Sequence, residues 1–102
     1  MILLDILFPN TPKGEKLKER AKLVLEELKK NGKTELSNIK KLCGSKANYK
    51  QIIYKFQKIK LIKIKREGGN KNIKFFVELS VNECLNFFNE EIQRDINSFF
   101  KS

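Results

Sequence analysis

The stretch SKANYKQIIYKFQKIKLIKIKREGGNKNIKFFVEL, residues 45–79, changes its hydrophobic period partway along. In its first half apolar residues recur every three or four positions, which predicts an amphipathic helix. From Leu61 onward apolar and charged residues alternate, which predicts β-strands. The Gly-Gly-Asn at 68–70 lies between two alternating runs and favours a tight turn. The stretch therefore predicts a helix at about 45–59 followed by an antiparallel hairpin at 62–79.

Two further helices are predicted before this stretch. Thr11 and Pro12 have the residue types of an N-cap and a first helical position, and an apolar face follows at helical spacing. This pattern predicts a helix over about 12–31. Apolar residues at helical spacing then predict a short helix at about 36–43, which Gly44 ends.

The two ends of the chain are apolar. The sequence from Ser80 to Glu83 has the form of a capping box, and an apolar stripe follows it, which predicts one long helix at about 81–100. We therefore expect three parts: an apolar N-terminal segment at 1–11, a central domain at 12–79 and a C-terminal helix within 80–102.

The positive charge of the chain is concentrated in one block. The formal net charge is +10, and residues 38–74 hold twelve Lys or Arg residues and a single acid, Glu67. The rest of the chain is close to neutral, with ten basic and eleven acidic residues. A one-sided block of this size repels itself unless an anion neutralises it. The distribution predicts a polyanionic partner.

Several classes of function are disfavoured by the composition. The chain has no His and its two cysteines, Cys43 and Cys84, are not in a CxxC motif, which argues against a zinc site. It shows no nucleophile–base pair and no phosphate-binding Gly loop, so we expect neither an enzyme nor a bound cofactor or metal. The two thiols are expected to be free and to serve packing, with oxidant sensing as the alternative. No signal peptide or apolar run of bilayer length is evident, which predicts a cytoplasmic protein without a membrane partner.

The order helix, helix, turn at Gly44, helix, hairpin, helix resembles a known family. The residues that carry the resemblance are LSNIKKLCGSKANYKQIIYKFQKIKLIKIKREGGNKNIKFF, residues 36–76. This stretch resembles the winged helix-turn-helix proteins, near the MarR/ArsR-like repressors and the small archaeal regulators, including viral and plasmid-encoded ones. The resemblance implies an α+β, mainly α fold with a two-stranded β wing and a long C-terminal helix. One departure is Lys60, which stands where family members often have Gly.

The resemblance implies a sequence-specific regulator that binds double-stranded DNA, in the host cytoplasm if the protein is viral. Helix 45–59 would enter the major groove, and the wing would lie on the adjacent backbone or minor groove. The expected contacts from the helix are Lys46, Ala47, Lys50, Gln51, Tyr54, Lys55 and Lys58. Those expected from the wing are Lys63, Lys65, Arg66, Lys71 and Lys74. The alternatives are a winged-helix module that binds proteins and an RNA-binding protein without operator specificity.

The apolar termini also predict a homodimer, because a winged helix does not need them to cover its own core. The expected interface residues are Ile2, Leu3, Leu4, Ile6, Leu7, Phe8, Leu85, Phe88, Ile92, Ile96, Phe99 and Phe100. The alternative is that both termini fold back on the core of the same chain.

Overall fold

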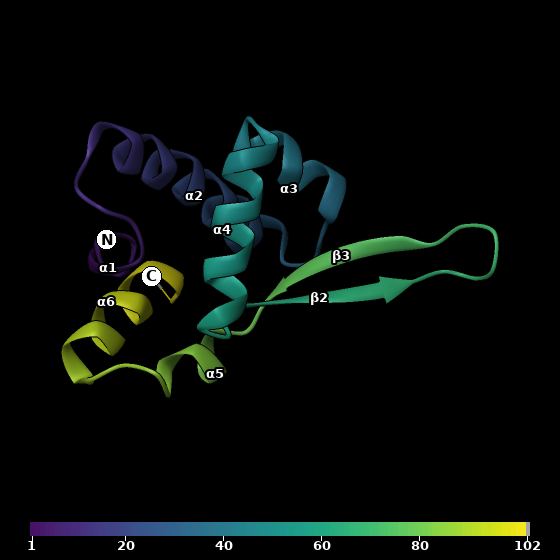
Figure 1. Ribbon diagram of the computed structural model, residues 1–102. Helices are drawn as coiled ribbons and strands as arrows, with labels where there is room; N and C mark the ends of the chain where they lie inside the picture. Colours follow the sequence, from purple (N-terminus) through teal and green to yellow (C-terminus); the bar gives the residue numbers. More distant parts are fainter. Residues whose placement is uncertain (102) are drawn as a thin grey trace.

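The structure, a computed structural model, describes residues 1–101 and is a mainly helical α+β fold (Figure 1). A three-stranded antiparallel sheet, with strand order β1-β3-β2, lies beside the helices. Its hairpin projects away from the helical part (Figure 1). The elements are α1 (Ile2–Leu7), α2 (Pro12–Asn31), β1 (Thr34–Glu35), α3 (Leu36–Cys43), α4 (Lys46–Lys58), β2 (Ile62–Glu67), β3 (Lys74–Leu79), α5 (Val81–Leu85) and α6 (Glu90–Phe100).

The helices α2, α3 and α4 form where the sequence predicts them. The Thr11 hydroxyl accepts a hydrogen bond from the Gly14 N–H at 3.0 Å, and the Ser45 hydroxyl accepts one from the Asn48 N–H at 3.1 Å. Each hydroxyl thereby satisfies one of the N–H groups that the first turn of a helix leaves without a backbone partner. Gly44, with φ 88°, separates α3 from α4. The predicted bounds 12–31 and 36–43 are confirmed.

The C-terminus of α4 is a Schellman motif built around Lys60. The Leu61 N–H donates to the Phe56 carbonyl at 2.9 Å, and the Lys60 N–H donates to the Gln57 carbonyl at 3.0 Å. Lys60 has a φ of 61°, in the left-handed region that favours glycine. Leu61 and Phe56 are both fully buried, so their packing holds the motif together. Lys60 therefore adopts the left-handed backbone conformation in which glycine is the usual residue.

The hairpin has the predicted strands but a longer connection. Strands β2 and β3 pair from Ile62 opposite Leu79 to Glu67 opposite Lys74. The connection between them spans residues 68–73, so the expected tight turn at 68–70 is wrong. Gly68 is required in this loop: its φ is 110°, and a Cβ atom there would lie 1.8 Å from the Asn72 carbonyl oxygen.

The third strand, β1, was not anticipated from the sequence. It has only two residues, with Thr34 paired to Val77 and Glu35 paired to Phe76. Two residues are too few to show an alternating pattern, which is why periodicity does not reveal this strand. The strand joins the end of α2 to the sheet and leaves the outer half of β3 without a neighbour on that side.

The C-terminal residues form two helices instead of the single helix predicted at 81–100. The break is stabilised at Asn89, whose side-chain oxygen accepts a hydrogen bond from the Ile92 N–H at 3.1 Å. The Gln93 side-chain amide donates to the carbonyls of Leu85 and Phe88, at 2.9 Å each, and so caps the end of the first helix. Asn89, followed by two glutamates, is thus an N-cap that the continuous apolar stripe concealed.

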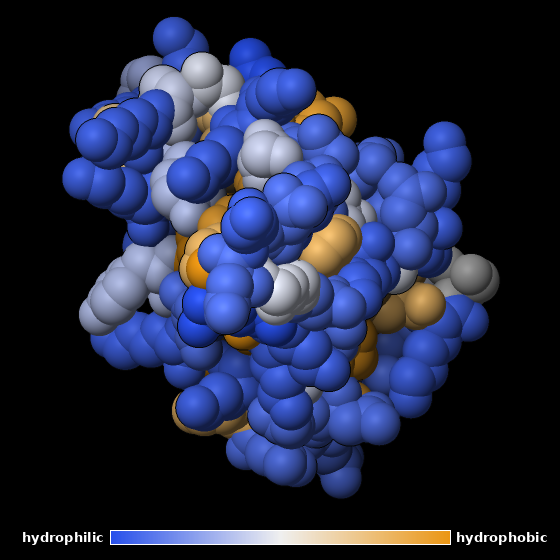
Figure 2. Space-filling view, turned by 90° about the vertical axis from the view of Figure 1, so that its right-hand side faces the viewer, coloured by the Kyte–Doolittle hydropathy of each residue, from blue (hydrophilic) through white to orange (hydrophobic). Residues whose placement is uncertain are grey.

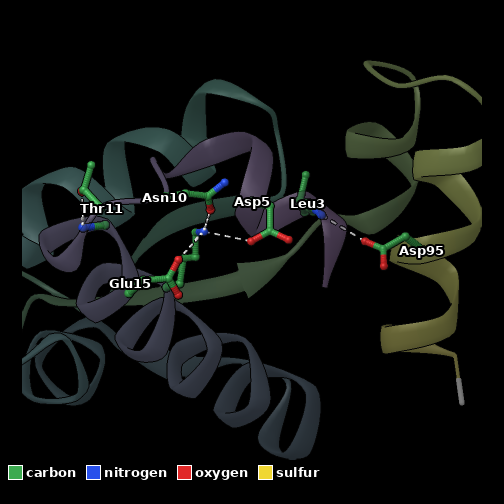
Figure 3. A network of polar contacts seen from close by, with 8 residues as sticks. Leu3, Asp5, Asn10, Thr11, Glu15 and Asp95 are labelled. Carbon is green, nitrogen blue, oxygen red and sulfur yellow. Dashed lines mark hydrogen bonds and ion pairs between the residues drawn. The ribbon is translucent and has the colours of Figure 1, made fainter.

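The N-terminal helix is part of the core of the same chain. Helix α1 lies against α2 and α6, and the Leu3 N–H donates to the Asp95 carboxylate at 3.1 Å (Figures 1 and 3). Leu3, Leu4, Phe8 and Ile96 are at most 4% exposed. Neighbouring elements of the same chain therefore cover these four residues, which were predicted to line a dimer interface.

A buried lysine holds the N-terminal segment in place. Lys18 in α2 is 8% exposed, and its ammonium group lies 2.9 Å from both the Asp5 and the Glu15 carboxylates (Figure 3). It also donates a hydrogen bond to the Asn10 side chain. The bond from Lys18 lowers the pKa of Asp5, and its two acidic partners raise the pKa of Lys18. This network joins α1, the connecting loop and α2.

Replacing Gly14 with Ala is expected to destabilise the protein, although Ala is usually the better helix former. A Cβ atom at this position would lie 1.8 Å from the Pro9 carbonyl oxygen, so the loop after α1 would have to move. We expect a loss of about 2 kcal/mol or more in the free energy of unfolding, which outweighs the ~1 kcal/mol that Ala gains in an open helix. Urea denaturation measures the change. Gly69→Ala, where a Cβ meets nothing within 4 Å, is the control, and equal midpoints for both variants would contradict the prediction.

Candidate nucleic-acid interface

One side of α4 is packed and the other is open to solvent. Ile52, Ile53 and Phe56 are at most 5% exposed and form the packed side. The side chains predicted to contact DNA lie on the other side. Tyr54 is 62% exposed, Gln51 is half-buried, and the remaining exposed members are Lys46, Ala47, Lys50 and Lys58. The amphipathic spacing in the sequence thus brings six of the seven predicted residues onto an open helix face.

The cations on this face have no carboxylate partner. Among residues 1–101, no ion pair joins Lys46, Lys50 or Lys58 to an acid. The Lys58 ammonium lies 5.9 Å from the centre of the Tyr54 ring, which leaves its charge uncompensated. An anion that approached the open face of α4 would therefore meet three lysines without first having to break an ion pair.

Lys55 differs from the other predicted residues of α4. Its ammonium group donates to the Leu7 carbonyl at the end of α1 and lies 4.9 Å from the centre of the Phe8 ring. It is half-buried and faces the N-terminal segment. Lys55, predicted to contact DNA, thus makes a hydrogen bond and a cation–π contact that hold α1 against α4.

The turn between α3 and α4 adds a residue that the sequence analysis did not select. Lys40 and Lys46 line a hollow of about 310 Å³ together with Gly44, Ser45 and Tyr49. The Lys40 ammonium lies 5.0 Å from the centre of the Tyr49 ring, and burial raises the pKa of the Tyr49 hydroxyl. Lys40 belongs to the basic block of residues 38–74. It was not among the predicted DNA contacts, because those were limited to helix 45–59 and the hairpin.

On the outer face of the hairpin, which is the face opposite Ile62 and Val77, the lysines lie beside acidic side chains. On the outer face, Lys65 pairs with Glu78 at 3.1 Å and Lys74 approaches Glu35 at 3.9 Å. Lys63 pairs with Glu83, whose pKa this hydrogen bond lowers. These pairs are partly exposed, so solvent screens them and each contributes little to stability. They nevertheless supply nearby negative charge to three of the five lysines and arginines predicted to contact DNA from the wing.

The remaining two cations of the predicted wing lie near its end. Arg66 and Lys71 are exposed and have no ion pair among residues 1–101. Arg66 is paired across the strands with Phe75, whose side chain is 45% exposed. Ile73, two residues before Phe75, is 42% exposed. Figure 2 views the molecule from the side toward which the hairpin projects. This side is largely hydrophilic, with small apolar patches between the polar side chains (Figure 2).

Of the predicted interface residues, Ile2 and Ile6 remain exposed, at 41% and 53%. The half-buried members pack against the core at its margin: Leu7, Leu85, Phe88, Ile92, Phe99 and Phe100. Besides Ile73 and Phe75 of the hairpin, two exposed apolar side chains were not among the predicted site residues: Leu23 at 43% and Phe87 at 54%. Leu23 lies on the outer side of α2, and Phe87 lies in the connection that breaks the predicted C-terminal helix.

Both thiols are buried and are expected to be unreactive. Burial raises the pKa of Cys43 and of Cys84 to about 11 each, from 9.0. The thiolate is the reactive form, so its fraction at neutral pH falls about 100-fold for a rise of two units in pKa. We expect iodoacetamide to label the native protein far more slowly than the urea-unfolded protein, as mass spectrometry would show. Equal labelling rates would contradict this expectation and would revive a role in oxidant sensing.

The same shift predicts an alkaline loss of stability. The folded state holds both thiol protons up to about pH 11, whereas the unfolded state releases them near pH 9. The unfolded state is therefore stabilised as pH rises from about 9 to 11, and the free energy of unfolding falls over this window. Replacing both cysteines with Ala would remove this part of the pH dependence.

Comparison of the chain with protein-family models, with curated proteins and with solved structures gives no match. Within residues 1–101, no helix is long and apolar enough to cross a bilayer.

Proposed function

We propose that this protein is a winged helix-turn-helix regulator that binds double-stranded DNA. Helix α4 would lie in the major groove, and the β2–β3 hairpin would be the wing that contacts the neighbouring backbone or minor groove. The observation that carries this proposal is the open face of α4, on which three unpaired lysines surround Gln51 and Tyr54. The order of α2, α3, α4 and the hairpin supports it.

The residues of the open face fall into two roles. Gln51 can donate to and accept from the edge of adenine, and Lys50 can donate to guanine O6 and N7. Lys46 and Lys58 lie toward the two ends of the helix and would contact phosphates, which position the helix without reading sequence. Ala47 lets the backbone approach the bases closely. Lys40, at the turn before α4, extends the row of phosphate contacts.

The wing is proposed to bind DNA mainly through Arg66 and Lys71. The three lysines of its outer face have carboxylates beside them, so each would release less counterion on binding than an unpaired lysine. Arg66 would lie in the minor groove, where narrow A/T tracts attract arginine.

The experiment that tests the function is a fluorescence-anisotropy titration of the purified protein with duplex DNA, and with RNA of matched length, at several salt concentrations. Six or so phosphate contacts predict that log K falls against log salt with a slope of about −5. A flat salt response, or tighter binding to RNA, would overturn the proposal. Selection of bound duplexes from a random pool would then give the sequence preference.

A homodimer is part of the proposal, on a smaller surface than the sequence predicts. Leu23 of α2, Leu42 of α3 and Phe99 of α6 line a hollow of about 740 Å³, together with lysines and glutamates of α2 that form its rim. A rim that carries both charges suits contact with its own copy across a two-fold axis. A partner seated on Ile6 and Phe87 would instead cover Tyr54 and Lys58, which line the same hollow. A mass of one chain from light scattering, at the protein concentration used for DNA binding, would contradict the proposed homodimer.

A further inference from the structure

The inner face of the hairpin, near its end, combines apolar side chains with unpaired positive charge. Side chains of directly paired residues in an antiparallel sheet point to the same face, so Arg66 and Phe75 lie together. Toward the base of the hairpin, the same face is buried against the helices at Ile62 and Val77. Farther out nothing covers it, and both Ile73 and Phe75 remain nearly half exposed. An exposed phenylalanine ring is unfavourably solvated, and a ligand that covers the ring would recover this free energy.

This face borders a hollow of about 210 Å³ between the hairpin and the start of α3. Strand β1 is only two residues long, so β3 has no neighbour here and the space beside its outer half is open. The hollow has apolar walls, a hydroxyl, a carboxylate and two ammonium groups. Its lining residues are Glu35, Leu36, Ser37, Lys40, Ile73, Lys74 and Phe75.

We propose that this hollow binds one unstacked nucleobase of the bound DNA. The Phe75 ring would stack on the face of the base, which is the contact that binds bases irrespective of sequence. The Ser37 hydroxyl and the Glu35 carboxylate would meet the polar edge of the base. Lys40 and Lys74 would neutralise the phosphates on either side, and Lys40 is shared with the hollow at the α3–α4 turn.

The charge of the site favours a nucleic acid over an apolar protein surface. Lys40 and Lys74 line the hollow beside its apolar walls, and Glu35 is the single acid among its lining residues. Glu35 approaches Lys74 at 3.9 Å, which is too long for a hydrogen bond, so its carboxylate retains acceptor capacity toward a base. The inference rests on the proposed function, since it assigns a second, base-binding contact to the same DNA complex.

The test compares two duplexes of the same sequence, one fully paired and one with a single unpaired base in the strand bound by the wing. The unpaired base has already lost its pairing and part of its stacking, so binding it costs less. We expect the protein to bind the bulged duplex about tenfold more tightly, as one base–aromatic stack contributes. Anisotropy titrations of a set of duplexes with the bulge at successive positions would locate the preferred one.

Two variants make the assignment specific. Phe75→Ala is expected to lose the preference for the bulge, so that it binds the bulged and the paired duplex with equal affinity. Phe87→Ala removes a ring that is 54% exposed and lies beside Tyr54 and Lys58, outside the hollow at Phe75, and it is expected to keep the preference for the bulge. 2-Aminopurine placed at the bulge reports directly on stacking of that base, independently of affinity.

Each outcome supports or overturns the inference. The inference is supported if Phe75→Ala loses the preference for the bulged duplex and Phe87→Ala keeps it. Tight binding to both duplexes with no preference at any bulge position overturns the base site and leaves the proposed function in place. A preference that survives in Phe75→Ala also overturns it, because the unpaired base is then bound elsewhere. Binding to neither duplex overturns the proposed function and the base site together.

Discussion

Replacing Lys46, Lys50 and Lys58 together with glutamine is expected to weaken binding to duplex DNA by two to three orders of magnitude. Each phosphate contact contributes about 0.9 to the slope of log K against log salt, so at ~0.1 M salt each lost contact costs nearly tenfold. The salt slope should fall in magnitude by about two at the same time, because Lys46 and Lys58 are the proposed phosphate contacts and Lys50 is assigned to the edge of a base. All three side chains are exposed and make no ion pair among residues 1–101, so the fold should tolerate the change.

The matched control removes the same charge from another surface. Lys13 and Lys16 on α2 and Arg94 on α6 are exposed, and their replacement with glutamine gives the same net charge. Long-range attraction to DNA depends on total charge, whereas a contact depends on position. The control variant should therefore bind DNA within a few-fold of the original protein. An equal loss in both variants would show that net charge alone drives binding and would remove α4 from the interface.

Replacing Phe8 with Ala is expected to lower the free energy of unfolding by about 3–5 kcal/mol, as for other fully buried phenylalanines. Phe8 is 1% exposed, and its ring lies beneath the Lys55 ammonium at 4.9 Å. A domain of this size has roughly 5–15 kcal/mol of stability in total, so the loss is a large share of it. Urea denaturation followed by circular dichroism measures the difference.

The comparison with Ile6→Ala separates packing within one chain from packing between chains. Ile6 lies on the same helix but is 53% exposed, so we expect a change of about 0.5 kcal/mol or less. If α1 were instead exchanged with a partner chain, the unfolding midpoint of Phe8→Ala would rise with protein concentration. A midpoint that does not depend on concentration, together with a large loss at Phe8 and a small one at Ile6, is the expected pattern.

The helices of the central part could be predicted because their signals are local. The Thr11 and Ser45 caps, the glycines that follow α2 and α3, and the apolar periodicity all act within a few residues. The open face of α4 follows from the same periodicity, since a helix buries one side and leaves the other exposed. The alternation in the two hairpin strands was equally readable, although the loop between them was not.

The errors arose where a stronger local pattern concealed a signal, as at Asn89, or where a distant contact decides the structure, as for Lys55 and the hairpin ion pairs. The apolar stripe of the last helix continues across Asn89, and the hydrogen bonds of Gln93 to Leu85 and Phe88 show that the chain bends there. Lys55 has the spacing of a contact residue, yet a carbonyl 48 positions earlier in the chain binds it. The ion pairs of the outer hairpin face join residues from β1, β2, β3 and α5, and no sequence window contains them all.

The sequence by itself determined three helices, the two strands of the hairpin and a concentration of positive charge in residues 38–74, because capping, periodicity and charge are written along the chain. Only the tertiary structure decided which lysines remain unpaired and which apolar residues remain uncovered. The apolar residues of the termini illustrate the difference. Any amphipathic helix needs a partner for its apolar face, but its own sequence does not say which one, and here α1 packs against α2 and α6 of the same chain.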